Sequence, residues 1–280
     1  MTGERILHAG PYRLPLRRPL VMGIVNVTPD SFSDGGKHPG PEAGLAHARR
    51  LLDEGADLLD IGGESTRPGA ATVPVDEELR RVIPVLERLA DCGRPLSVDT
   101  RKPAVMRAAL AAGAAMVNDV EALQAPGALE ALAASDAAVC LMHMQGTPET
   151  MQREPHYDDV VAEVRGFLAA RVAACRAAGI DAARIVVDPG FGFGKTMQHN
   201  LALLRRLDAL APDGIPVLAG LSRKGMLGVL TGRPVGERVH ASVAAALAAV
   251  AHGAAIVRVH DVAATVDALA VWNAVHNLGQ

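Results

Sequence analysis

Residues 95–119 read PLSVDTRKPAVMRAALAAGAAMVND, and they contain the unit from which the chain is built. A short apolar run at 95–99 leads through a polar loop into a helical stretch, and a second apolar run follows at 115–119. Pro103 suits the first turn of a helix, where no backbone donor is needed. This alternation of short strands and helices predicts parallel strands joined by crossover helices.

The same unit recurs along the chain. Strands are predicted at 20–26, 57–61, 95–99, 115–119, 138–143, 184–188, 216–221 and 255–259. Between these runs the apolar residues fall at helical spacing, as in the stripe Leu79, Val82 and Leu86. Eight such units in 280 residues predict an α/β fold with a single (β/α)8 TIM barrel, whose usual length is about 250 residues. A doubly wound open sheet is the alternative. We expect an N-terminal extension with a short hairpin at 1–19 and the barrel at 20–280.

The composition narrows the class of protein. Hydrophobic residues make up 49% of the chain and the net charge is −3, so neither nucleic acid nor a membrane surface is an expected partner. Apolar stretches fall short of the ~20 residues of a membrane helix, and the first residues do not resemble a signal peptide. Three widely spaced cysteines predict neither a disulfide framework nor a zinc cluster. We expect a soluble cytoplasmic protein with reduced cysteines.

Each predicted strand ends in polar or charged residues. They are Asn26, Asp60, Asp99, Asn118, Asp119, His143, Asp188, Ser222, Arg223, Lys224, Arg258 and His260. In a barrel the carboxyl ends of all strands converge on one mouth, where active sites are built. Carboxylates and cations placed so regularly predict an enzyme.

Loop phenylalanines indicate the shape of the ligand. Of only four phenylalanines, Phe32, Phe191 and Phe193 fall in loops after predicted strands, which favours stacking on a planar ring. The segment GFGFGKT (190–196) ends like a phosphate-binding loop, but Pro189 stands where that motif requires glycine. We therefore expect the repeated glycines to let this loop approach a ligand closely.

Eight segments, in this order, resemble dihydropteroate synthase. They are MGIVNVTPDSFSDGG (22–36), EGADLLDIGGESTRPGA (54–70), SVDTRKP (97–103), MVNDV (116–120), LMHMQGTP (141–148), DPGFGFGKT (188–196), GLSRKGMLG (220–228) and VRVHDV (257–262). The resemblance implies a pterin-binding barrel of folate biosynthesis. Such an enzyme joins p-aminobenzoate to 6-hydroxymethyl-7,8-dihydropterin diphosphate and releases pyrophosphate. It also implies a homodimer that uses Mg2+ and is inhibited by sulfonamides.

The resemblance also implies a role for individual residues. Pterin binding is expected of Asp99, Asn118, Met142, Asp188, Phe193 and Lys224. Pyrophosphate binding is expected of Asn26, Thr66, Arg67, Arg258 and His260, with Asn26 also the Mg2+ ligand. The p-aminobenzoate pocket is expected to comprise Phe32, Thr66, Pro68, Lys224 and Gly225. Catalytic roles are expected of Asp99, Lys224 and Arg67.

Two positions depart from the family pattern. Gly225 stands where many members carry a serine that holds the benzoate carboxylate, and Glu121 adds a charge near the pterin mouth without an assigned purpose. Two rival functions share the pterin-reading carboxylates. The resemblance implies that the segment SFSDGG (31–36) is a lid over the substrates. A pterin-dependent methyltransferase would need neither this lid nor the pyrophosphate-binding residues. A non-catalytic pterin-binding paralogue would be expected to have lost the lid or one of the charged catalytic positions. We therefore favour the synthase.

Overall fold

The computed structural model of the protein describes residues 5–28, 40–65, 69–147 and 150–276. Four residues with predicted roles, Phe32, Thr66, Arg67 and Pro68, lie outside the described residues.

Eight parallel strands form a closed barrel, in the order β10-β3-β4-β5-β6-β7-β8-β9. They are β3 (Leu20–Asn26), β4 (Leu58–Gly62), β5 (Leu96–Asp99), β6 (Met116–Asp119), β7 (Ala138–Met142), β8 (Ile185–Asp188), β9 (Val217–Ala219) and β10 (Ala254–Val259). Closure between β10 and β3 confirms the (β/α)8 prediction, and the open-sheet alternative is wrong.

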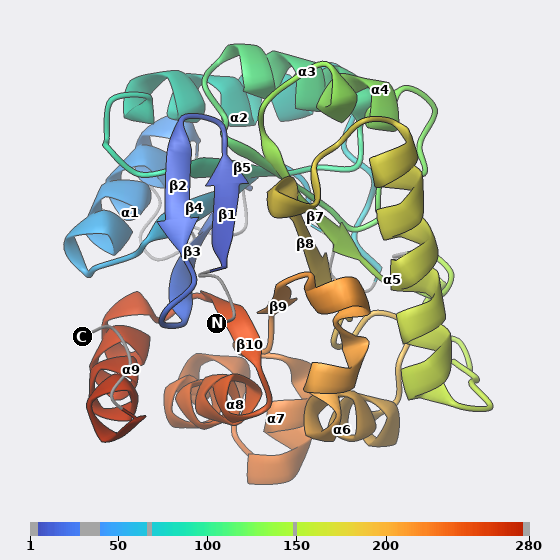
Figure 1. The fold of residues 1–280 in the computed structure, drawn as a ribbon. Coiled ribbons are helices and arrows are strands. Elements are labelled where there is room, and N and C mark those ends of the chain that lie inside the picture. The colour runs from blue at the N-terminus through green and yellow to red at the C-terminus, as the bar shows by residue number, and fades with distance from the viewer. Residues whose placement is uncertain (1–4, 29–39, 66–68, 148–149, 277–280) are drawn as a thin grey trace.

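Helices surround the barrel and connect its strands (Figure 1). They are α1 (Pro41–Asp53), α2 (Val75–Leu89), α3 (Pro103–Ala111), α4 (Ala128–Ala133), α5 (Val160–Ala177), α6 (Met197–Arg205), α7 (Gly225–Thr231), α8 (Val239–Ala251) and α9 (Val262–His276). Pro103 occupies the first turn of α3, as predicted. Two helices, α7 and α8, connect β9 to β10, and α9 follows the last strand.

The strands are buried on both faces, as expected of a parallel sheet covered by helices. In β3 the alternating residues Val21 and Val25 belong to the large core beneath the helices. Leu20 and Met22 belong to a second core that also contains Leu7 of the hairpin. Side chains of a strand point alternately to its two faces, so this second core is the interior of the barrel.

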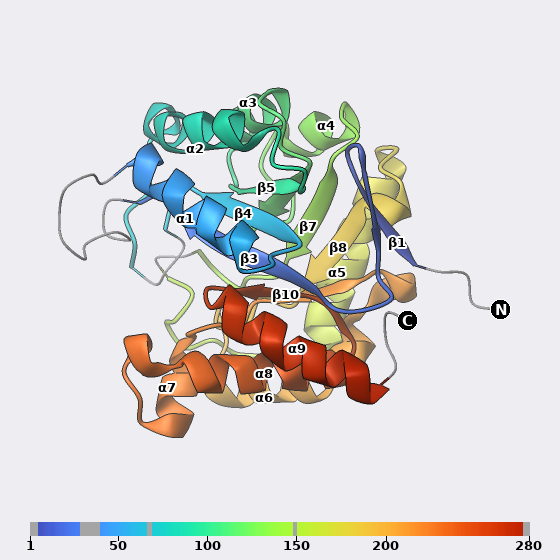
Figure 2. The ribbon, with the colours of Figure 1, turned by 90° about the vertical axis from the view of Figure 1, so that its left-hand side faces the viewer.

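The N-terminal hairpin closes one end of the barrel. It comprises β1 (Ile6–Ala9) and β2 (Tyr12–Pro15), paired antiparallel. Leu7 and Ala9 are buried in the interior core, and the Gly10 N–H donates to the carbonyl oxygen of Asp136 at 3.0 Å. Figure 1 shows the hairpin lying across the end of the barrel, and Figure 2 shows it away from the loops of the opposite end. The predicted hairpin is confirmed; the exact division of the chain at residue 19 stays a prediction.

The cysteines are unpaired. All three cysteines lie in the described part of the chain and form no disulfide; Cys140 and Cys175 are buried. Among the described residues, no helix is long and apolar enough to cross a membrane.

Candidate active site

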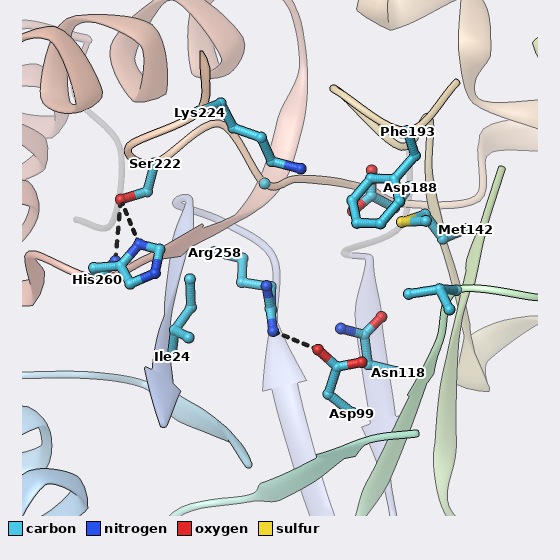
Figure 3. Close-up of a pocket in the computed structure, with 12 residues that line it drawn as sticks. Ile24, Asp99, Asn118, Met142, Asp188, Phe193, Ser222, Lys224, Arg258 and His260 are labelled. Carbon is cyan, nitrogen blue, oxygen red and sulfur yellow. Dashed lines mark hydrogen bonds and ion pairs between the residues drawn. The ribbon is translucent and has the colours of Figure 1, made fainter. Parts of the chain in front are cut away.

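A pocket of about 440 Å³, partly open to solvent, lies at the carboxyl ends of the strands. Its lining residues are Ile24, Asp99, Asn118, Val120, Met142, Asp188, Phe193, Gly220, Ser222, Lys224, Arg258 and His260. Figure 3 shows these side chains converging from separate strands and loops.

Asp188 stands at the end of β8 with a buried side chain. Its Oδ1 accepts a hydrogen bond from the Gly190 N–H at 2.7 Å, which fixes the carboxylate. Burial raises the pKa of Asp188, and the cations of Lys224 and Arg258 oppose that effect. The remaining acceptor capacity of this carboxylate is directed to the pocket, where it can pair with N–H donors of a ligand.

The loop after β8 is held from beneath by a buried lysine. Lys195 is 3% exposed, and its ammonium donates to the carbonyl oxygens of Phe193 at 2.9 Å, Gly190 at 3.0 Å and His143 at 3.3 Å. Its Nζ also lies 3.0 Å from Nδ1 of His143. Burial lowers the pKa of Lys195 to about 7. This lysine therefore anchors the loop that carries Phe193, whereas a phosphate-binding lysine would face the ligand.

Glycine is required where this loop passes the β7 loop. Gly190 has φ +68°, and a Cβ there would lie 1.9 Å from the carbonyl oxygen of His143. Gly194 has φ +62°, and its Cβ would lie 2.5 Å from the carbonyl oxygen of Gln145. Both positions need the left-handed conformation and the absence of a side chain. Gly190 and Gly194 thus serve the close packing of two loops, and the expected close approach of the loop to a ligand stays a prediction.

An ionic network forms the wall of the pocket opposite Phe193. Arg258 Nε donates to Asp60 Oδ2 at 2.6 Å, and its NH2 group donates to Asp99 Oδ2 at 2.7 Å. Asn118 Nδ2 donates to the same Asp60 oxygen at 2.9 Å. Figure 3 shows the guanidinium reaching from β10 to Asp99. Four strands, β4, β5, β6 and β10, are connected through this network.

Two pocket groups titrate close to neutral pH. Burial raises the pKa of Asp99 to about 7, against the opposing effect of Arg258. Burial lowers the pKa of Lys224 to about 8, although Asp188 and Asp99 favour its charged form. The Lys224 ammonium donates to the carbonyl oxygen of Phe191 and lies 4.3 Å from the centroid of the Phe193 ring. Such perturbed groups in a pocket are typical of active sites.

Ser222 and His260 line the pocket side by side. The Ser222 hydroxyl lies 3.0 Å from Nδ1 of His260 and accepts its backbone N–H at 3.2 Å. The adjacent Arg223 points elsewhere, since its guanidinium pairs with Asp261 at 3.1 Å through Nε. Of the sequence Ser222–Arg223–Lys224, the first and third residues therefore line the pocket.

The loop between β4 and α2 is anchored by charged side chains at its base. Glu64 Oε1 accepts the Val73 N–H at 2.7 Å, so one carboxylate ties both ends of the loop together. Lys102 pairs with Glu64 Oε2 at 3.0 Å, and Arg101 pairs with it at 3.2 Å. Glu121, without a purpose in the sequence, holds Arg101 at 2.9 Å. The negative charge of Glu121 thus helps to hold Arg101 against Glu64 at the base of this loop.

Several predicted residues meet in one pocket. They are Asp99, Asn118, Met142, Asp188, Phe193, Lys224, Arg258 and His260. Asn26 ends β3 and Gly225 begins α7, and neither is among the lining residues. The roles assigned to these residues stay predictions.

Three strand-end or loop residues differ from expectation. Phe191 is 1% exposed and belongs to the hydrophobic core, so its predicted stacking on a ligand is wrong. Asp119 accepts the N–H groups of Glu121 and Leu123 and caps a turn instead of facing the pocket. His143 lies beneath the β8 loop against Lys195, as described above.

Three features of the site were not predicted from the sequence. They are the loop-anchoring role of Lys195, the position of Ile24 in the pocket lining, and the ion pair between Asp60 and Arg258. In the sequence, Lys195 belonged to a segment that fails the phosphate-binding pattern, and Ile24 was one of several apolar residues of a predicted strand. Asp60 was noted as a strand end, but its pairing with Arg258 joins residues 198 positions apart. That contact depends on the closure of the barrel.

Comparison with known proteins agrees with this site. The sequence profile of the family described as pterin binding enzyme matches residues 22–260. A dihydropteroate synthase of Neisseria meningitidis serogroup B is 56% identical over 278 residues, which cover 97% of this chain and 98% of that protein.

Solved structures agree over the whole fold. Xanthomonas albilineans dihydropteroate synthase with 4-aminobenzoic acid superposes with a TM-score of 0.93 at 60% identity, covering 99% of this chain and 100% of that one. Burkholderia cenocepacia dihydropteroate synthase complexed with 7,8-dihydropteroate gives 0.90 at 57% identity, covering 98% and 97%. The chain therefore belongs to the family of pterin-binding enzymes. Within that family it is a member of the dihydropteroate synthases.

Proposed function

We propose that this chain condenses 6-hydroxymethyl-7,8-dihydropterin diphosphate with p-aminobenzoate, giving 7,8-dihydropteroate and pyrophosphate. It is a transferase of folate biosynthesis. The observation that carries this function is the composition of the pocket: hydrogen-bond acceptors of Asp188 and Asn118 stand opposite the ammonium of Lys224, beside the Arg258–Asp99 pair. A pterin ring carries N–H donors on its amino-pyrimidine edge and acceptors on the edge opposite, so the two patterns are complementary.

Pterin binding is assigned to the deepest part of the pocket. Asp188 accepts the ring N–H and one amino hydrogen, as a carboxylate does with paired donors. Lys224 donates to the carbonyl oxygen and ring nitrogen of the other edge. Met142 and Phe193 cover the ring faces, and Asn118 reads the amino group from the side. The cation of Lys224 against the Phe193 ring at 4.3 Å keeps both side chains in place.

The chemical step transfers the pterin methylene group from oxygen to nitrogen. The C–O bond breaks, and its electron pair leaves with pyrophosphate. The p-aminobenzoate nitrogen then supplies the pair for the new C–N bond and gives one proton to water. Asp99, when ionised, stabilises positive charge on the pterin methylene group by electrostatics. Arg258 and His260, which both line the pocket, bind the departing phosphate oxygens.

Mg2+ is proposed as the metal that neutralises the diphosphate. In the described part of the chain no group of three or more His, Cys, Asp or Glu side chains could hold a metal ion. The donor set therefore fits a metal that arrives with the substrate: the Asn26 amide oxygen at the end of β3 is a hard ligand, and Mg2+ usually keeps substrate oxygens and water for the rest. When bound, Mg2+ lowers the charge of the leaving group.

The second substrate, p-aminobenzoate, is assigned to the region outside the pterin. Lys224 and Gly225 border it from the β9 loop. Phe32, Thr66, Arg67 and Pro68 complete this subsite and the pyrophosphate site in our proposal, on the strength of the resemblance. Glu64 and Val73 support it from the described side, because their hydrogen bond anchors the loop that carries three of these residues. Sulfonamides would compete for this subsite.

A homodimer is proposed through the side of the barrel formed by α7, α8 and α9, which lie together in Figure 2. The inner face of α8 is buried against the barrel. Large apolar side chains are exposed on the neighbouring segments: Val229 72%, Leu230 54%, Val235 56%, Val271 67% and Val275 69%. Exposed apolar residues gathered on one side are typical of an interface. Sedimentation velocity would test this, with a monomer at micromolar concentration contradicting it.

The chain is assigned to the cytoplasm.

The decisive experiment follows pyrophosphate release by purified protein with the pterin diphosphate and Mg2+. We expect release that depends on p-aminobenzoate, with dihydropteroate formed in equal amount. Tight pterin binding without such release would contradict the synthase and favour the non-catalytic paralogue. That rival is disfavoured now because the described charged positions Asp99, Asp188, Lys224 and Arg258 are all present.

A further inference from the structure

Asp60 is the middle residue of β4 and lies behind the pocket wall, where it contacts the lining residues Arg258 and Asn118. Its side chain is fully buried. Oδ2 accepts from both Arg258 Nε at 2.6 Å and Asn118 Nδ2 at 2.9 Å, while Oδ1 has no hydrogen-bond partner among the described residues. Burying a carboxylate costs free energy even in an ion pair. A fully buried carboxylate beside a pocket therefore suggests a role in holding the neighbouring groups in place.

The carboxylate determines which way round the Asn118 amide lies. A carboxylate paired with a guanidinium only accepts hydrogen bonds, so the side of the amide turned toward Asp60 is its NH2 group. The amide oxygen lies on the other side, buried and without a partner among the described residues. Figure 3 shows that oxygen on the side of Met142, and the nitrogen on the side of Arg258. An unpaired buried oxygen on a pocket wall is an acceptor that a ligand can complete.

We propose that Asp60 is a positioning residue that fixes Asn118 as a hydrogen-bond acceptor and thereby makes the pocket select rings with a 2-amino group. The inference rests on the proposed function, since it places the pterin ring in this pocket. Asp188 and the Asn118 oxygen then face three N–H donors: one on the ring and two on the amino group. A 2-oxo ring would set its oxygen against these acceptors, lone pair against lone pair.

The test compares two ring compounds, pterin and its 2-oxo counterpart lumazine, by titration calorimetry. We expect the unchanged protein to prefer pterin by at least about 100-fold, because a site built to accept from an N–H group rejects a ring that lacks it. In Asp60→Ala no acceptor holds the amide, so Asn118 can rotate and present its NH2 group. The preference should then fall by at least about tenfold.

Matched variants separate positioning from folding. Asp60→Asn keeps one carbonyl oxygen that can accept from Asn118, so we expect it to retain the preference within about threefold. Asp60→Leu fills the space of the carboxylate with an apolar side chain that cannot accept, and it serves if Asp60→Ala does not fold. Asp119→Ala removes another fully buried strand-end carboxylate that does not line the pocket. It should lower thermal stability and leave the preference unchanged.

The outcomes are distinct from those of the proposed function. A preference in Asp60→Ala or Asp60→Leu equal to that of the unchanged protein would overturn the role of Asp60, while synthesis of dihydropteroate by the unchanged protein would stand. Comparable binding of pterin and lumazine by the unchanged protein would also overturn it, whatever the variants do. Pterin-selective binding lost in Asp60→Ala and kept in Asp60→Asn would support it, even if no product formed.

Discussion

The pH dependence of kcat/KM for the pterin diphosphate follows from two groups in the pocket. Asp99 acts as an anion, so activity requires a pH above its raised pKa of about 7. Lys224 donates from its ammonium form, so activity requires a pH below its lowered pKa of about 8. The profile should be a narrow bell with its maximum near about pH 7.5. At about pH 6 and about pH 9 the value should be about sevenfold below the maximum.

Lys224→Arg separates the two limbs. Arginine stays charged across this range, so the fall above about pH 8 should disappear while the acid limb remains. The absolute rate of the variant will be lower, because a guanidinium does not reproduce the contacts of an ammonium. The readout is therefore the shape of the profile from about pH 5.5 to about pH 9.5, measured as initial rates of pyrophosphate release.

Comparison of the two proteins removes the ionisation of the substrate, which is the same in both assays. The ratio of the two profiles should be flat below about pH 7 and should change by about tenfold per pH unit well above about pH 8. An alkaline limb that persists unchanged in Lys224→Arg would refute the assignment of this limb to Lys224. A wild-type profile that is flat from about pH 6 to about pH 9 would refute both assignments.

Three further substitutions give distinct results. Lys195→Met removes the ammonium that donates to three carbonyl oxygens, of which that of Gly190 keeps the Phe193 N–H as a donor, so urea unfolding should show a loss of at least about 2 kcal/mol, and an unchanged stability would contradict the anchoring role. The pKa of His143 is lowered to about 3 by burial, so the unfolded chain takes up a proton first as pH falls below about 6.5 and stability is lost toward pH 3. His143→Asn should remove on the order of 3 kcal/mol of that loss at about pH 4, and parallel stability curves for the two proteins would count against it. Gly225→Ser has open space for its side chain, so by the family resemblance the KM for p-aminobenzoate should fall about fivefold with the pterin KM unchanged; an unaltered p-aminobenzoate KM would exclude this contact.

The fold was predictable because the signal repeats. A short apolar run, a polar loop and a helical stretch recur often enough to predict eight strands, and the bounds of β3 agree residue for residue. Other strands differ by one or two residues at their ends. For β9 the predicted run at 216–221 is longer than the observed Val217–Ala219, because Gly220 already belongs to the pocket wall.

The site was predictable in part. Polar residues at strand ends correctly located the mouth, but neighbouring residues of a strand point to opposite faces. Asn118 therefore faces the pocket while Asp119 caps a turn behind it. The loop after β8 shows the same limit, since Phe193 lines the pocket and Phe191 lies in the core. The residue type at the end of a strand does not tell whether its side chain points into the pocket or away from it.

Contacts between distant strands could not be predicted from one sequence. Asp60 and Arg258 meet because β10 closes the barrel against β3, beside β4. The anchoring contacts of Lys195 depend on the left-handed glycines of its loop, whose backbone path has no simple pattern. In both cases buried polar groups satisfy one another across elements, which local propensity does not describe.

The most direct test of pterin recognition is the dissociation constant of 6-hydroxymethylpterin for the unchanged protein and for Asp188→Asn, measured by calorimetry. Asp188→Asn keeps the shape of the side chain and replaces a charged acceptor with a neutral amide. Hydrogen bonds to charged groups contribute about 1.5–3 kcal/mol each, so affinity should fall by at least about 100-fold. Equal affinity in the two proteins, both folded, would contradict pterin binding at this carboxylate and with it the proposed function of the pocket.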